Sequence, residues 1–220
     1  MNYFIANFKQ NLTQSDLDTW LKEFDERLVP QSDQKIIISP SFPFLQHFNS
    51  STDLSLAAQD VSPFSSGAHT GQVGAEQIKD YVDFCIIGHS ETRGSNDIKQ
   101  VVDKAKKLIE NNITPIVCLD LPYLESQIKS LKDASVDPSS LIYAYEPASA
   151  IDSDKPEDPL QANQVAQQIN QLTSSPNVLY GGSVDDQNVD AFLSQPHING
   201  VLVGSASLDP IKFAKIVSRE

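Results

Sequence analysis

The chain alternates between short apolar runs and longer segments in which apolar residues recur at helical spacing. Most of the runs are continuously apolar, as expected for parallel strands that are covered on both faces. We therefore expect eight strands, at residues 3–6, 35–38, 54–58, 84–87, 114–118, 141–145, 178–180 and 201–203.

Helical periodicity fills the segments between these runs. Ser15 and Ser95 precede two such segments and are predicted N-cap residues, and Pro156 and Pro159 suit the start of the third. In each of three segments, the apolar residues share one helical face. They are Leu17, Trp20, Leu21, Phe24 and Leu28 in the first segment, Val101, Ala105 and Leu108 in the second, and Val165, Ile169 and Leu172 in the third.

Strand and helix alternate along the whole chain, which predicts an α/β fold with a parallel sheet. Eight strands favour a single closed (β/α)8 barrel, a TIM barrel, although an open doubly wound sheet produces the same pattern. No Gly-x-Gly-x-x-Gly follows the first strand, so the dinucleotide-binding alternative lacks its phosphate loop. No linker interrupts residues 1–220, and we expect one domain.

The charge and the cysteine content limit which binding partners and which cellular compartment we expect for this protein. The 29 acidic residues outnumber the 16 basic ones, and a net charge of −13 disfavours nucleic acid and anionic membranes as partners. Cys85 and Cys118 both lie in apolar runs, so we expect buried thiols and a reducing compartment. With neither a signal peptide nor an apolar run of the roughly 20 residues that span a bilayer, the cytoplasm is the expected location.

In a barrel, the residues that follow each strand meet at the C-terminal face and carry the chemistry. These positions combine a carboxylate, an imidazole, a cation and two loops of small residues. Together they could bind an anion and move protons. The residues are Asn7 and Lys9 after the first strand, His89, Ser90 and Glu91 after the fourth, Glu146 after the sixth, Gly181 to Ser183 after the seventh, and Gly204 and Ser205 after the eighth.

Each of these residues also has an ordinary structural interpretation. Lys9 alone could be a solvated side chain, and His89 could be a structural hydrogen-bonding residue. Glu146 follows a buried run, where an ionised carboxylate is costly without partners, so a functional role is more credible there. The glycines near residues 181 and 204 could form simple turns.

Taken together, the motifs around these positions occur in a specific order. They include Asn7-Phe8-Lys9, AAQDV from Ala57, GAHTG from Gly67, IIGHSETR from Ile86, TPIVC from Thr114, AYEP from Ala144, YGGSV from Tyr180 and GVLVGSASL from Gly200. In this order and spacing, from residue 7 to residue 208, they resemble the triosephosphate isomerase family. The resemblance implies a (β/α)8 barrel.

The resemblance also implies an activity, the interconversion of dihydroxyacetone phosphate and glyceraldehyde 3-phosphate. Glu146 matches the family's general base, and His89 matches its neutral imidazole electrophile, with a pKa lowered by a helix N-terminus. This family is itself the standard worked case of that mechanism. Lys9 matches the cation that faces the substrate and Asn7 a hydrogen-bonding neighbour, with Ser90 and Glu91 in support. No metal or organic cofactor is implied, because base, electrophile and cation are all side chains.

Two further expectations follow from the resemblance. The substrate phosphate would lie on backbone N–H groups of Ser183, Gly204 and Ser205, beside a short helix after the last strand. The loop from Gly67 to Gln72 matches the family's interdigitating loop and implies a homodimer, although it could also be an ordinary surface loop.

The loop after Glu146 departs from the family. Residues 147–155 read PASAIDSDK where the family commonly reads PVWAIGTGK, so Asp152 and Asp154 replace the glycines at its tip. The Asp152 carboxylate could repel a bound phosphate, or it could face solvent while its backbone N–H still contacts the phosphate. Ser205, which stands at a family glycine, adds a side chain to the same pocket.

These departures leave two alternative functions open. One is a related barrel isomerase that acts on another small hydroxy-carbonyl compound, and the acidic lid motivates it. The other is a binding protein with the same fold that has lost useful catalysis. The retained Glu146, His89 and Lys9 argue against the second alternative.

Overall fold

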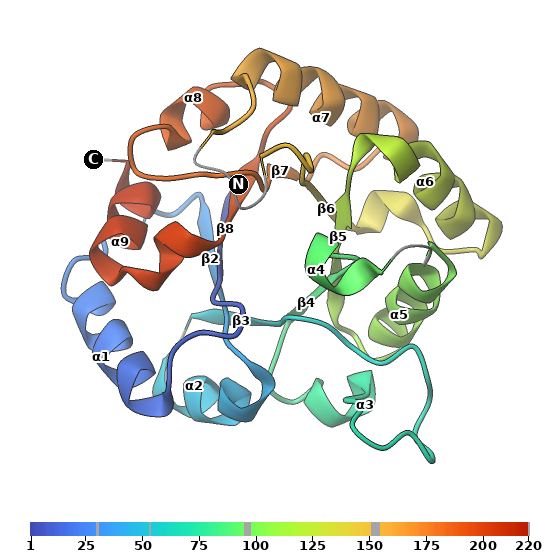
Figure 1. Ribbon diagram of the computed structural model, residues 1–220, viewed down its shortest axis with the longest axis horizontal. Helices are drawn as coiled ribbons and strands as arrows, with labels where there is room; N and C mark the ends of the chain where they lie inside the picture. Colours follow the sequence, from blue (N-terminus) through green and yellow to red (C-terminus); the bar gives the residue numbers. More distant parts are fainter. Residues whose placement is uncertain (30, 53, 95–97, 151–154, 220) are drawn as a thin grey trace.

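Eight parallel strands close into a barrel in chain order, with helices around it (Figure 1). The computed structural model describes residues 1–29, 31–52, 54–94, 98–150 and 155–219. The closure confirms the predicted barrel and rules out the open sheet. The strands are β1 (Asn2–Asn7), β2 (Gln34–Ser39), β3 (Ser55–Ala58), β4 (Phe84–Ile87), β5 (Thr114–Leu119), β6 (Ile142–Tyr145), β7 (Val178–Tyr180) and β8 (Gly200–Val203).

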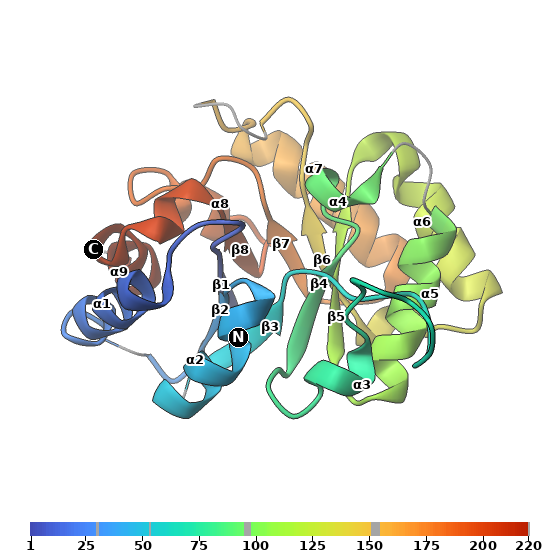
Figure 2. The ribbon, with the colours of Figure 1, turned by 60° about the horizontal axis from the view of Figure 1, so that its bottom comes forward.

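The helices form the outer layer, and Figure 2 shows α1, α2 and α9 on one flank of the barrel with α5 and α6 on the other. Short 3-10 turns occur at Phe42–Phe44, Leu121–Tyr123, Pro138–Ser140 and Ser205–Leu208. The α-helices are α1 (Gln14–Asp25), α2 (Leu45–Ser51), α3 (Ala75–Ile78), α4 (Ser90–Arg93), α5 (Ile98–Glu110), α6 (Leu124–Asp133), α7 (Pro159–Thr173), α8 (Val189–Leu193) and α9 (Pro210–Ser218).

The core has two parts, and this division explains why the strands are continuously apolar. Ile5 of β1 belongs to the cluster that fills the barrel interior. Its neighbours Phe4 and Ala6 belong to the larger cluster between the barrel and the helices. Because both faces of each strand are buried, alternation between apolar and polar residues is lost.

The start of α1 corrects one predicted helix cap. The N-cap is Thr13, not Ser15: the hydroxyl of Thr13 accepts from the backbone N–H of Asp16, and the Asp16 carboxylate accepts from the backbone N–H of Thr13 at 2.8 Å. This reciprocal pair satisfies two free N–H groups at once, which a lone serine cap cannot do. The helix also ends at Asp25, although Leu28 still packs against the core.

The start of α7 agrees better with the sequence pattern. Pro159 is its first residue, as predicted, and the Asp158 carboxylate caps it by accepting from the backbone N–H of Leu160 at 2.9 Å. Pro156 lies before the helix, and Ser95 lies outside the described residues.

Both cysteines are free and buried, as expected from the sequence. Cys85 belongs to the cluster between barrel and helices, whereas Cys118 points into the barrel interior. The two thiols therefore lie on opposite faces of neighbouring strands. In the described part of the chain, no helix has the length and apolar character needed to cross a membrane.

Gly200 is where the barrel closes, because β8 pairs with β1 there and Gly200 lies opposite Tyr3. Its φ is +156°, and a Cβ at this position would lie 2.2 Å from the Tyr3 carbonyl oxygen. Gly200→Ala should therefore lower the free energy of unfolding by more than about 2 kcal/mol. Gly74→Ala is the matched control, because its added Cβ meets nothing closer than 3.7 Å. Urea unfolding of both variants checks this, and equal midpoints would show that the barrel seam tolerates a side chain.

Candidate active site

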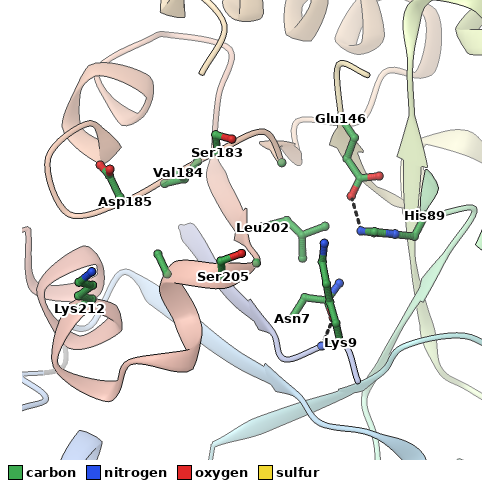
Figure 3. A pocket seen from close by; sticks show the side chains of 13 residues that line it. Asn7, Lys9, His89, Glu146, Ser183, Val184, Asp185, Leu202, Ser205 and Lys212 are labelled. Atoms are coloured by element: carbon green, nitrogen blue, oxygen red, sulfur yellow. Dashed lines mark hydrogen bonds and ion pairs between the residues drawn. The ribbon is translucent and has the colours of Figure 1, made fainter. Parts of the chain in front are cut away.

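Lys9 follows β1 in a strained backbone conformation. Its φ is +50°, a region that non-glycine residues rarely occupy, and its backbone N–H donates to the Asn7 side-chain oxygen at 3.1 Å. Such strain costs about 1–3 kcal/mol and persists only where the surroundings impose it. The conformation directs the Lys9 side chain into the mouth of the barrel, near His89 (Figure 3).

Two side chains hold the strained residue through its carbonyl group. The Ser41 hydroxyl donates to the Lys9 carbonyl oxygen at 3.0 Å, and the Gln59 amide donates to the same oxygen at 2.9 Å. The Gln59 amide also donates to the carbonyl of Ser39 at 2.9 Å. Neither Ser41 nor Gln59 is among the site residues predicted from the sequence. Gln59 lies within the AAQDV run, which offered a signal, whereas nothing in the local sequence marks Ser41.

His89 caps the short helix α4 and is thereby fixed in one tautomer. Its Nδ1 accepts from the backbone N–H of Glu91 at 3.2 Å, so Nδ1 carries no proton and the ring is neutral. The proton is then on Nε2, which lies 3.3 Å from Oε1 of Glu146. The structure thus presents a neutral N–H donor to the cavity.

Glu146, directly after β6, is only 3% exposed. Burial raises the pKa of its carboxyl from 4.5 to about 8, against the opposing effects of hydrogen bonds from the Cys118 thiol and the Ser90 backbone and of the nearby Lys9 charge. The free energy cost of desolvating the carboxylate therefore exceeds what these partners return. A buried carboxyl with such a pKa is a strong base when ionised.

Glu91 and Ser90 lie beside the cavity rather than on its wall. The Glu91 carboxylate accepts a hydrogen bond from the Lys9 ammonium at 2.6 Å and so fixes the position of the Lys9 side chain. Ser90 contributes its backbone N–H to Glu146. Both predicted supporting residues are thus placed to orient other groups.

A cavity of about 540 Å³ opens at this end of the barrel. Figure 3 shows Lys9, His89 and Glu146 directed toward one another at one side of it. The predicted residues on its wall are Asn7, Lys9, His89, Glu146, Ser183, Gly204 and Ser205. Gly181, which the sequence places in the loop after the seventh strand, also lines the cavity. The remaining lining residues, which the sequence does not single out, are Val184, Asp185, Leu202, Ala206 and Lys212.

The opposite wall is formed by the loops after β7 and β8. Ser183 has a φ of +47°, and its hydroxyl donates to the Ala150 carbonyl at 2.6 Å, which links this loop to the one after β6. Gly204 passes close to Lys9, since a Cβ there would lie 3.5 Å from its Cε. Ser205 begins the 3-10 turn beside the cavity. Small residues therefore let backbone approach the space in front of Lys9.

Two glycines make room for buried side chains at this end of the barrel. A Cβ at Gly181 would lie 2.8 Å from the Cγ of Glu146, so a side chain there would displace the carboxyl. Gly88 has a φ of +69°, and a Cβ there would lie 2.5 Å from Nη2 of Arg93.

Arg93 is itself buried and joins three segments. Its guanidinium donates to the carbonyls of Gly88 at 3.0 Å and Cys118 at 2.9 Å, and to the Gln127 side chain at 3.0 Å. It thereby fixes the ends of β4 and β5 relative to α6. Arg93 ends the IIGHSETR motif, but the sequence pattern indicates no role for it.

Within the described ranges, no group of three or more His, Cys, Asp and Glu side chains is arranged to hold a metal ion. The groups that face the cavity are a carboxyl, a neutral imidazole and an ammonium. This set suits proton transfer next to an oxygen that gains negative charge.

A family model of triosephosphate isomerase matches residues 2–220. The chain belongs to the triosephosphate isomerase family. It is 36% identical to a triosephosphate isomerase of Mesomycoplasma hyorhinis, over 97% of this chain and 96% of the relative. A Thermus thermophilus triosephosphate isomerase is 34% identical over 96% of both chains, and one from Prochlorococcus marinus is 34% identical over 98% of this chain and 97% of the relative.

The acidic sequence that follows Glu146 is the main departure from the triosephosphate isomerase pattern. Asp152 and Asp154 lie outside the described residues, so the expected contact of Asp152 with a phosphate remains a sequence-based expectation. After these residues, Glu157 holds the chain in place through hydrogen bonds to two tyrosines of the barrel. Its backbone N–H donates to the Tyr180 hydroxyl at 2.9 Å, and its carboxylate accepts from the Tyr145 hydroxyl at 3.2 Å.

The raised pKa of Glu146 predicts a pH-dependent effect on stability. An unfolded glutamate releases its proton near pH 4.5, whereas the folded protein holds the Glu146 proton until about pH 8. The wild type therefore loses stability as pH rises through this window. Glu146→Gln has no carboxyl at this position and does not lose stability in this way. The melting temperature of the variant minus that of the wild type should therefore be greater at pH 9 than at pH 5 by at least about 2–4 °C, equivalent to about 1 kcal/mol.

The matched control is Glu125→Gln, which replaces an exposed carboxylate on α6. Its melting temperature should track the wild type at both pH values. A gap between Glu146→Gln and the wild type that stays constant from pH 5 to pH 9 would contradict the raised pKa.

Proposed function

We propose that this chain interconverts dihydroxyacetone phosphate and glyceraldehyde 3-phosphate, the reaction that gives its family its name. One observation carries the proposal beyond family membership. The Glu146 carboxyl and the His89 Nε2 lie 3.3 Å apart, at one end of a cavity that Lys9 also lines. These are the base, the electrophile and the cation that an enediolate intermediate requires.

The proposed reaction moves one proton between adjacent carbons. Ionised Glu146 removes the proton from the carbon beside the carbonyl, and the electron pair moves onto the carbonyl oxygen to form the enediolate. The Nε2–H of His89 and the Lys9 ammonium stabilise the negative oxygen, with Asn7 as a further donor. The proton of the adjacent hydroxyl group passes to the former carbonyl oxygen, relayed through Nε2 of His89. Glu146 then returns its proton to the former carbonyl carbon while the other oxygen becomes the new carbonyl, so no protons are consumed.

The basicity of Glu146 supports its role. A carboxylate with a pKa of about 8 is a far better proton acceptor than one with the ordinary value of 4.5. Burial thus has two consequences, because it strengthens the base and reduces the ionised fraction at neutral pH. The nearby Lys9 ammonium favours the ionised form and limits that reduction.

The phosphate of the substrate would lie against the loops after β7 and β8. Ser183, Gly204 and Ser205 line this side, and the 3-10 turn Ser205–Leu208 begins there. Their backbone N–H groups would donate to the phosphate. Small residues and backbone donors next to a cation are a common arrangement for phosphate in barrels. Ser205 adds a hydroxyl to this wall.

The proposed activity is tested with the purified protein in a coupled isomerase assay. Glu146→Gln should lower kcat by about 10³-fold, because the amide cannot accept the proton. For the wild type, kcat/KM should rise about tenfold per pH unit and level off above pH about 8, where Glu146 of the free protein is ionised.

Glu125→Gln should behave as the wild type in the same assay, which excludes a general effect of losing one carboxylate. If the Glu146→Gln variant turned over substrate as fast as the wild type, Glu146 would not be the base. No turnover of either triose phosphate by the wild type would sink the proposed function.

We also propose that the protein is a cytoplasmic homodimer. The loop between β3 and α3 projects away from the barrel (Figure 1) and carries Gly67 to Gln72. Within it, the rings of Phe64 and His69 stack with centroids 4.3 Å apart, and Phe64 is 51% exposed. An exposed aromatic stack on a projecting loop suits burial against a second copy. The two buried free thiols support a reducing compartment.

Phe64→Asp should convert the dimer into monomers, because it places a charge in the proposed interface. Leu160→Asp is the matched control, since Leu160 is 64% exposed but lies at the start of α7. Sedimentation velocity at micromolar concentration distinguishes the two. A wild-type protein that sediments as a monomer, or a Phe64→Asp variant that stays dimeric, would overturn the proposed interface.

A further inference from the structure

The cavity continues beyond the groups that the proposed reaction uses. One end holds Glu146 and His89, and the wall then runs past Ser205 to Asp185 and Lys212 (Figure 3). Lys212 comes from the first turn of α9, and Asp185 from the loop before α8. The far end of the cavity therefore carries charged side chains with no part in the isomerisation.

The size of the cavity also exceeds the need of the proposed substrate. A triose phosphate has only ten non-hydrogen atoms. A cavity of about 540 Å³ lies well inside the range of roughly 300–1,000 Å³ that accommodates drug-sized ligands. Space for a longer molecule is therefore present along the same wall.

Lys212 is the second cation that lines the cavity, after Lys9. Among the residues that the structure describes, the Lys212 ammonium has no ion-pair partner, whereas Lys215 on the same helix faces the Asp186 carboxylate at 3.9 Å. The neighbouring Asp185 carboxylate is engaged elsewhere, because its Oδ1 accepts from the backbone N–H groups of Gln187 at 2.9 Å and Asn188 at 3.0 Å. The Lys212 charge is thus available to a ligand in the cavity.

We propose that Lys212 forms a second anion subsite in this cavity. The subsite takes the far end of a phosphorylated compound that carries a second anionic group, either a phosphate or a carboxylate. Such a ligand places its first phosphate on the wall formed by Ser183, Gly204 and Ser205, and therefore competes with the triose phosphate. The inference rests on the proposed function, because it uses the same phosphate wall.

The test compares two series of probes of equal chain length. Alkyl monophosphates carry one anion, whereas α,ω-alkanediol bisphosphates of two to six carbons carry two. Inhibition of triose phosphate turnover, together with calorimetric titration, gives a dissociation constant for each probe. At low ionic strength, one or more bisphosphates should bind about fivefold more tightly than the matching monophosphate, and the advantage should shrink at about 0.5 M salt.

Three variants assign the advantage to its source. Lys212→Gln should remove the roughly fivefold preference for the bisphosphate. Asp185→Asn should increase the preference, since it removes an opposing charge and keeps a side-chain oxygen that can accept hydrogen bonds. Lys215→Gln is the matched control on the same helix, outside the cavity wall, and should leave the preference as in the wild type.

The outcomes separate this inference from the proposed function. If monophosphates bind and no bisphosphate binds more tightly, the second subsite is wrong and the proposed function stands. If Lys212→Gln weakens both series by the same factor, the lysine acts only through its general field and the subsite is also wrong. If neither series binds, both the subsite and the phosphate wall fail.

Discussion

The chemistry of this site depends on the removal of water from one carboxyl group. Glu146 lies at the end of β6, almost fully buried, and the loss of hydration raises its pKa to about 8. Hydrogen bonds from Cys118 and Ser90 return only part of that cost. The fold tolerates this because a closed barrel supplies a large core elsewhere, and the result is a strong base beside a neutral imidazole.

Backbone constraints, more than side-chain contacts, bring the remaining groups into place. Lys9 occupies a strained conformation that Asn7, Ser41 and Gln59 hold through its backbone. The absence of a side chain at Gly181 leaves room for the Glu146 carboxyl. Several positions around one cavity therefore lower the stability of the folded protein. Such concentration of strain is characteristic of functional sites.

Much of this could be predicted from the sequence, because parallel strands buried on both faces leave continuous apolar runs and functional residues follow them. The Ser15 cap was wrong because local pattern alone does not decide between Thr13 and Ser15 as acceptors for the first turn. The hydrogen bond from Ser41 to Lys9 and the position of Lys212 on the cavity lining arise only when segments distant in the chain meet, and no local pattern signals them. The effect of Asp152 and Asp154 on phosphate binding stays a prediction from sequence.

The most direct test of this account is the ionisation of Glu146 itself in the protein without ligand. The side-chain carboxyl carbon can be followed by ¹³C NMR across pH 4 to 10, with Glu146→Gln used to assign its resonance. The account predicts a carboxyl that titrates near pH 8, far above the value of 4.5 for an exposed glutamate. Titration near pH 4.5 would contradict it, because burial would then not control the base.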